Sequence, residues 1–222
     1  ASSFAFAPFD RALEAEPVHE LELLAGSGYR IIALETSEPA RASGICMELA
    51  LRLQMPVFEW TCVTGLVPLG VGGLNENTIE PLAALASFHA TTEPVVCVMR
   101  DIGTHLDNDR IVGMMGQIAS SGRGHLVLID SRIDMPDRLR ASTAVYALPR
   151  PSQQHVAQHV ARRIDELCAG NAHRSELDDA GRARLAQALV GLTLEEIDRV
   201  VSRIAVEDKL FSDKDIDLAA SL

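Results

Sequence analysis

Short apolar segments alternate with helix-like segments over the first 148 residues of this 222-residue chain. Apolar runs that lack polar alternation are typical of strands buried on both faces of a sheet. We expect five of them, at residues 29–36, 56–61, 94–100, 125–130 and 144–148. Strands separated by helices form βαβ units, so this part of the chain predicts an α/β domain with a parallel sheet of about five strands.

The pattern changes at Pro149, after which only helical periodicity remains. Thr193 precedes Glu196, and Ser212 precedes Asp215, at the spacing of a capping box. Helices are expected at residues 151–168, 176–189, 193–206 and 213–221. The chain therefore predicts two domains, an α/β domain at 1–148 and a small all-helical domain at 149–222. The glycine-rich segment 65–77 is expected to be a loop or a short hairpin.

The segment after the first strand stands where a phosphate-binding loop would lie, and such a loop needs glycines for close backbone approach and a lysine for the phosphate oxygens. It reads Ser37-Glu38-Pro39-Ala40-Arg41-Ala42-Ser43-Gly44, with a single glycine and no lysine. The only lysines of the chain are Lys209 and Lys214, both in the helical part. These residues exclude a standard P-loop and also a G-x-G-x-x-G dinucleotide loop.

The third strand ends in Arg100-Asp101, which resembles a Walker B segment whose aspartate holds Mg²⁺. Ile102 follows where an active ATPase of this type carries a second acid, so we interpret Asp101 as vestigial. The alternative is a small hydrolase or ligand-binding site formed by Asp101, His105 and Asp130, because α/β proteins bind ligands at the carboxyl ends of their strands. No metal site and no catalytic residue is predicted.

Other residues favour structural roles. His155 and His159 are spaced to chelate a metal on one helix face, but no third ligand is evident, so we expect a solvated face. Asp107 and Asp109 are expected near a helix N-cap. The four cysteines, Cys46, Cys62, Cys97 and Cys168, are far apart, and we expect reduced thiols within the core of a cytoplasmic protein.

Charge and hydropathy exclude further classes of partner. The net charge is −11, which argues against a general nucleic-acid or anionic-membrane surface, because phosphates would be repelled on average. No apolar run reaches the ~18 residues needed to span a bilayer.

Several segments resemble one family. They are Leu34 to Glu38, "LALRLQMPVFEWTCVTGL", "VVCVMRDIGTHL", "LVLIDS" and "LVGLTLEEIDRVVSRIAVED". Together they are similar to the N-terminal module of the uncharacterised AAA ATPase family first noted as a hypothetical chloroplast open reading frame. The resemblance implies a degenerate AAA+-like α/β domain followed by a helical lid.

The resemblance also implies a function, namely a catalytically inactive module that serves assembly or partner recognition within a larger ATPase. Asp130 and Ser131 would stand at the sensor position, and Arg132, Arg138 and Arg140 would be candidates for contact with a neighbouring subunit. ATP and Mg²⁺ would belong to the parent protein, with no cofactor on this chain. The expected partners are a C-terminal AAA domain of the same polypeptide or further copies of the chain. We expect this chain to be a fragment of that parent.

Overall fold

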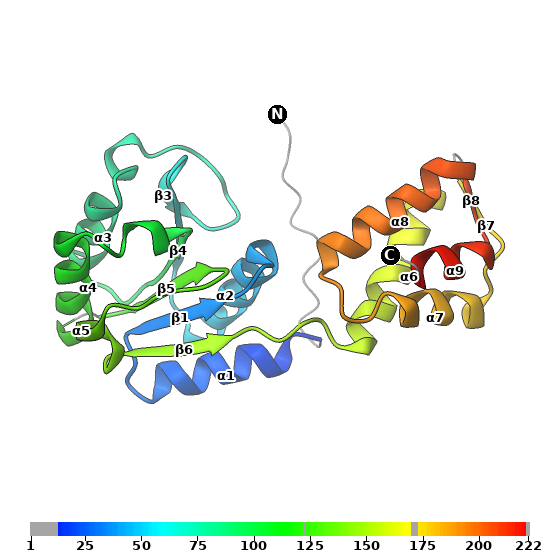
Figure 1. The fold of residues 1–222 in the computed structure, drawn as a ribbon. Coiled ribbons are helices and arrows are strands. Elements are labelled where there is room, and N and C mark those ends of the chain that lie inside the picture. The colour runs from blue at the N-terminus through cyan, green and yellow to red at the C-terminus, as the bar shows by residue number, and fades with distance from the viewer. Residues whose placement is uncertain (1–12, 122, 170–172, 221–222) are drawn as a thin grey trace. The chain divides into compact units, whose positions relative to one another are not determined.

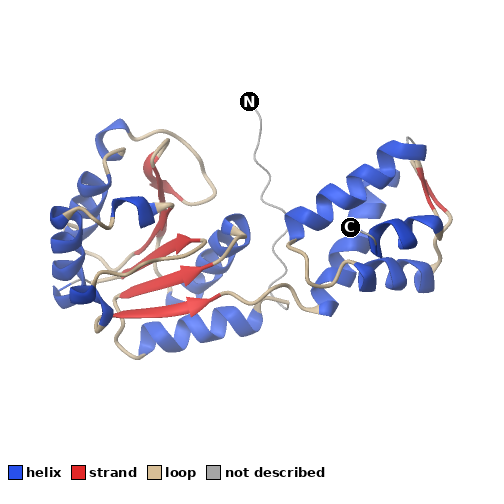
Figure 2. Ribbon diagram, viewed as in Figure 1, coloured by secondary structure: helices blue, strands red, loops and turns tan. Residues whose placement is uncertain are grey.

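The computed structural model describes residues 13–121, 123–169 and 173–220. The chain divides into two compact units, Ala1–Pro149 and Arg150–Leu222. The predicted domains were 1–148 and 149–222. Figure 2 shows the sheet in the first unit and mainly helices in the second. No described helix is long and apolar enough to cross a membrane.

The first unit contains a sheet of six strands in the order β3-β2-β4-β5-β1-β6 (Figure 1). The strands are β1 (Ile31–Glu35), β2 (Val57–Thr61), β3 (Gly65–Pro68), β4 (Val96–Arg100), β5 (His125–Asp130) and β6 (Thr143–Ala147). All neighbouring pairs are parallel except β2 and β3, which are antiparallel. The α/β class with a largely parallel sheet is confirmed.

Helices connect these strands and cover both faces of the sheet (Figure 1). They are α1 (Ala15–Gly26), α2 (Pro39–Leu53), α3 (Pro81–His89), α4 (Asp109–Ser121) and the short α5 (Asp137–Arg140), with 3-10 turns η1 (Glu76–Thr78) and η2 (Ile102–His105). Side chains alternate between two cores. In β1, Ile31 and Ala33 pack into one core with α3 and α4, whereas Ile32 and Leu34 pack into the other with α1 and α2. Burial on both faces explains the unbroken apolar run.

The sheet has one strand more than the five predicted, and the additional strand is β3. Its residues lie in the glycine-rich segment for which a loop or a short hairpin was expected, and a hairpin with β2 forms. Gly65 makes the turn possible, because it has φ of +65° and an added Cβ would lie 2.2 Å from the carbonyl oxygen of Asn75. The sequence pattern missed the strand because only four residues of it pair.

The second unit is built from α6 (Gln153–Ala169), α7 (Asp179–Ala188), α8 (Leu194–Asp208) and α9 (Lys214–Ala220). Its core includes Val156 and Ile164 of α6 together with Ile197, Val201 and Ile204 of α8. Thr193 forms the predicted capping box, since its Oγ1 accepts the Glu196 N–H and the Glu196 carboxylate accepts the Thr193 N–H. At Ser212 the structure shows the carboxylate of Asp215 accepting the Ser212 N–H at 2.6 Å.

The expectation of an all-helical domain was wrong in one detail. Two short strands, β7 (Arg174–Ser175) and β8 (Leu210–Phe211), pair in parallel. The Glu176 N–H also bonds to the Phe211 carbonyl, which keeps the chain extended where a helix was expected to start. Consequently α7 begins later, at Asp179, after Asp178 caps it by accepting the Gly181 N–H.

Candidate functional site

The carboxyl ends of the parallel strands form the edge where α/β proteins bind their ligands. The chain leaves β1 toward β2 through α2 and leaves β5 toward β6 through α5, so the strand order reverses between β1 and β5. Glu35 and Asp130 are register partners at that point. The loops that follow β1, β4 and β5 therefore form the candidate site.

The loop after β1 consists of Thr36, Ser37 and Glu38 alone, because α2 starts at Pro39. Thr36 Oγ1 accepts the Glu38 N–H at 3.0 Å and tightens this turn. A phosphate-binding loop is longer and wraps its amides around the anion. The connection here has only three residues between β1 and α2.

A buried ion-pair network occupies the first turn of α2. Arg41 makes a bidentate contact with Glu14, with Nε–Oε1 at 2.6 Å and Nη2–Oε2 at 3.1 Å, and its Nη1 bonds to Glu38 Oε2 at 2.9 Å. The same Nη1 donates to the carbonyl of Pro149 at 2.8 Å. The side chains of Arg41, Glu14 and Glu38 are 7%, 1% and 5% exposed. Burial lowers the pKa of Arg41, but the two carboxylates outweigh it and the net pKa is raised.

The loops after β4 and β5 are bound to each other. Asp130 Oδ2 accepts the Gly103 N–H at 3.2 Å, and its Oδ1 accepts the Ser131 N–H at 2.7 Å. Asp101 is exposed, and its backbone adopts the left-handed conformation with φ of +57°. Ile102 is fully buried in the core. The aspartate of the predicted Walker-B-like position is thus on the surface, and the next residue packs inward.

The alternative site of Asp101, His105 and Asp130 does not assemble into a metal-binding group. Among residues 13–121, 123–169 and 173–220, no cluster of three or more metal-ligating side chains occurs. The ring of His105 stacks edge-on against Trp60, with centroids 6.2 Å apart. Asp130 satisfies the backbone of the neighbouring loop, which is a structural role.

Two acids of this edge that the sequence pattern did not single out also bond to neighbouring groups of the protein. Glu35 Oε1 accepts the Ile133 N–H at 2.9 Å. Glu59 accepts the hydroxyl of Ser43 at 2.6 Å and lies 3.9 Å from Arg100. Arg41 could have been noticed three residues after Glu38, but its contact with Glu14 spans 27 positions and has no local signal.

The three arginines proposed for intersubunit contact lie on the surface after β5. Arg132 pairs with Asp134 at 3.3 Å, Arg138 with Asp109, and Arg140 with Asp137 at 3.2 Å. Their side chains are 79%, 56% and 69% exposed. Arg140 also donates to the carbonyl of Met135, so part of its role is to hold α5.

His155 and His159 are buried, which corrects the expectation of a solvated face. Helix α6 packs against both α7 and α8, so neither side of it is fully open. His159 Nδ1 is 2.8 Å from the Arg162 guanidinium, which can only donate, and its Nε2 is 2.8 Å from Asp198. Nε2 therefore carries the proton and donates to Asp198.

The cysteines do not all lie in the core. Cys46 and Cys97 are buried, and burial raises the pKa of both thiols, that of Cys97 to about 12. Cys62 was expected in the core but is exposed, because it starts the turn between β2 and β3. Cys168 is partly exposed. All four are free thiols.

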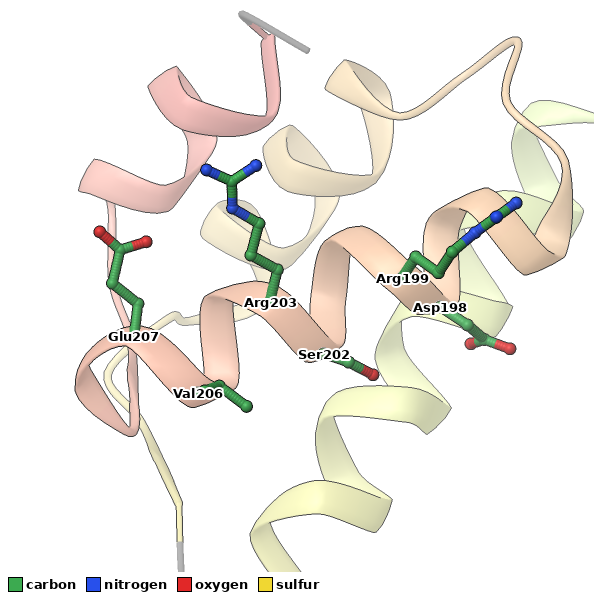
Figure 3. Close-up of a pocket in the computed structure, with 6 residues that line it drawn as sticks. All are labelled: Asp198, Arg199, Ser202, Arg203, Val206 and Glu207. Atoms are coloured by element: carbon green, nitrogen blue, oxygen red, sulfur yellow. The ribbon is translucent and has the colours of Figure 1, made fainter.

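The helical unit carries a shallow hollow along α8. Figure 3 shows its lining, to which this one helix contributes Asp198, Arg199, Ser202, Arg203, Val206 and Glu207. Asp198 is already engaged by His159 and by Arg163, at 2.8 and 3.3 Å. None of the site residues predicted from the sequence lies in this hollow.

Two curated proteins match nearly the whole of this chain at low identity. This chain is similar to the uncharacterized AAA domain-containing protein ycf46 of Trieres chinensis, with 24% identity over 91% of its length. The homologue from Guillardia theta is 24% identical over 90% of the chain. The chain spans 40% of the length of each relative.

Solved structures share the fold at low identity. C. elegans PCH-2 superposes with a TM-score of 0.63 at 12% identity, over 99% of this chain and 70% of that one. A chain of the E. coli MS115-1 HORMA:CdnC:Trip13 complex gives a TM-score of 0.62 at 10% identity, over 94% and 88%. A point variant of Thermotoga maritima RuvB gives 0.59 at 12% identity, over 96% and 68%.

Two adjoining family profiles account for most of the chain. The N-terminal domain of SpoVK-like AAA ATPases matches residues 17–148, and the second domain of the same family matches residues 155–221. The first match alone covers more than half of the sequence. This chain therefore belongs to the SpoVK-like AAA ATPases.

Proposed function

We propose that this chain is a non-hydrolysing AAA module that supports the assembly of a larger ATPase or the recognition of its partners. One observation carries the proposal. The first turn of α2, where a P-loop protein holds phosphate, is occupied by the buried Glu14–Arg41–Glu38 network. Two carboxylates at this place repel an incoming anion, and Arg41 is saturated by its own partners.

The rest of the edge supports the same conclusion. The sheet unit lacks a lysine for the phosphates, and the buried Ile102 stands where a water-polarising acid is needed. Asp130 already bonds to backbone groups. Nucleotide and Mg²⁺ would then be handled by a separate AAA domain, which fits the 40% share of the relatives' length that this chain spans.

The test is calorimetric titration of the chain with ATP, with and without Mg²⁺. We expect no saturable binding tighter than the millimolar range and no ATP hydrolysis. Micromolar binding, or turnover above buffer, would overturn the proposal. Glu38→Ala is the matched variant: if the carboxylate repels phosphate, ATP affinity rises in the variant relative to the wild-type chain.

We also propose that Arg138 or Arg140 contacts a nucleotide-bearing neighbour in the parent assembly. Both guanidinium groups are exposed, and the planar fork of arginine suits phosphate. The isolated chain should sediment as a monomer or a weakly associating species. In a full-length parent, Arg138→Ala combined with Arg140→Ala should lower ring formation or ATPase rate, and unchanged values of both would exclude these arginines.

A further inference from the structure

The two edge strands of the six-stranded sheet, β3 and β6, differ in whether other groups bond to their outward-facing backbone. At β3, the outward-facing N–H of Leu66 donates to Thr78 Oγ1 at 2.8 Å, and the Leu66 carbonyl accepts from Asn75 Nδ2 at 3.1 Å. Pro68 removes a further donor from that strand. Capping an edge in this way prevents another strand from pairing with it.

The opposite edge, β6, has no such cap in the part of the chain that the structure describes. It pairs only with β1 and is the last strand in the order (Figure 1). The Leu148 N–H bonds to the Glu35 carbonyl on β1. Because backbone groups alternate in direction along a strand, those of Thr143, Val145 and Ala147 point away from β1.

The open part of this edge is centred on Val145 and Ala147. Both residues are exposed, Val145 at 58%. Thr143 is buried and lies at the start of the strand. The strand contains no charged residue and no proline, the two features that commonly blunt an edge. A backbone that exposes donors and acceptors beside apolar side chains is suited to bind an extended segment.

Acidic residues on the helix next to this edge favour a basic partner. Helix α1 packs Val18 and Leu21 into the same core as Tyr146. Glu16 and Glu20 of the same helix are exposed. Burial raises the pKa of Tyr146 most, the two carboxylates raise it further, and Arg41 lowers it. A second copy of the chain would bring the same two acids against their equivalents, whereas a basic strand would be attracted.

We propose that β6 binds an extended basic peptide segment of a partner protein, which adds as a further strand along Val145 and Ala147. Main-chain hydrogen bonds to these two residues hold the segment, and alternate lysine or arginine side chains face Glu16 and Glu20. Binding by strand addition draws affinity from the backbone and specificity from alternate side chains. The interaction needs no nucleotide, so it stands independently of the proposed function.

The test uses the whole chain and a short probe peptide in which valine and lysine alternate. Amide hydrogen exchange should slow at Val145 and Ala147 on binding, while the Tyr146 amide, already bonded to β1, should not change. A matched peptide with glutamate in place of lysine should bind about tenfold more weakly or worse, because two exposed ion pairs are lost.

Two variants separate the contributions. Val145→Pro removes an outward N–H without breaking the ladder to β1 and should abolish binding, whereas Val145→Thr should retain it. Glu16→Lys with Glu20→Lys should reverse the preference between the two peptides, and this readout remains if the proline variant misfolds. Unchanged exchange at Val145 and Ala147 with saturating peptide would overturn the proposal. Protection at these amides that rises with protein concentration alone would indicate self-pairing and would also overturn it.

Discussion

Substitution of Arg41 tests whether the buried ion-pair network stabilises the start of α2. In Arg41→Met the long side chain is kept but its charge is lost. Glu14 and Glu38 then remain with side chains only 1% and 5% exposed and without their shared counter-ion. Removing one partner of a buried ion pair destabilises a protein by about 3–5 kcal/mol, because the remaining charge stays desolvated.

Trp60 provides the assay. It is the only tryptophan of the chain and is fully buried in the sheet unit, so its fluorescence reports the unfolding of that unit in urea. A loss of about 3 kcal/mol should lower the urea midpoint by about 1 M or more, given the usual dependence of stability on urea. The control is Arg52→Met, whose side chain is 31% exposed and pairs with Glu22 at 3.3 Å. Exposed pairs contribute about 0–1 kcal/mol, so this midpoint should move little.

If Arg41→Met shifts the midpoint no more than Arg52→Met, the network at α2 is not a buried ion pair in solution, and it would then not keep phosphate away from the start of α2. Adding Glu14→Gln and Glu38→Gln to Arg41→Met should recover part of the lost stability, because no buried charge would remain.

Three further changes test the local structure. Thr193→Ala should destabilise the helical unit by about 1 kcal/mol through loss of the capping box, as followed by circular dichroism, with Ser202→Ala inside α8 as the nearly neutral control. Gly124→Ala should strongly lower the thermal midpoint, because the added Cβ would lie 1.9 Å from the Val95 carbonyl oxygen. Its control is Gly113→Ala, which has open space around the added Cβ and should stabilise α4 by up to about 1 kcal/mol. Burial lowers the pKa of His125, so the unfolded chain binds more protons than the folded chain just below pH 6.5. The contribution of neutral His125 to stability is therefore complete above that pH and is lost on acidification. The variant His125→Asn should show a smaller drop in urea midpoint between pH 7.5 and pH 5 than the wild-type chain.

Local signals in the sequence were sufficient for the fold class. The apolar runs predicted β1, β4 and β5 most directly, because strands buried on both faces need apolar side chains at nearly every position. The strands β2 and β6 are only partly buried, and shorter apolar runs were enough to predict them. The spacing of Thr193 and Glu196 predicted a cap that the structure shows, since both residues act within one turn. The missing lysine was also evident from the sequence alone.

Contacts between distant segments were decided only by the tertiary structure. Glu14 meets Arg41 because α1 packs on α2, and no local pattern encodes this. His159 was expected in solvent but is buried, because periodicity along one helix does not show how many neighbours will cover it. The same holds for the sheet edges. Each strand is a short-range feature, but the spatial order of the strands decides that β3 is the edge bonded by Thr78 and that β6 is the edge without such a cap among the described residues.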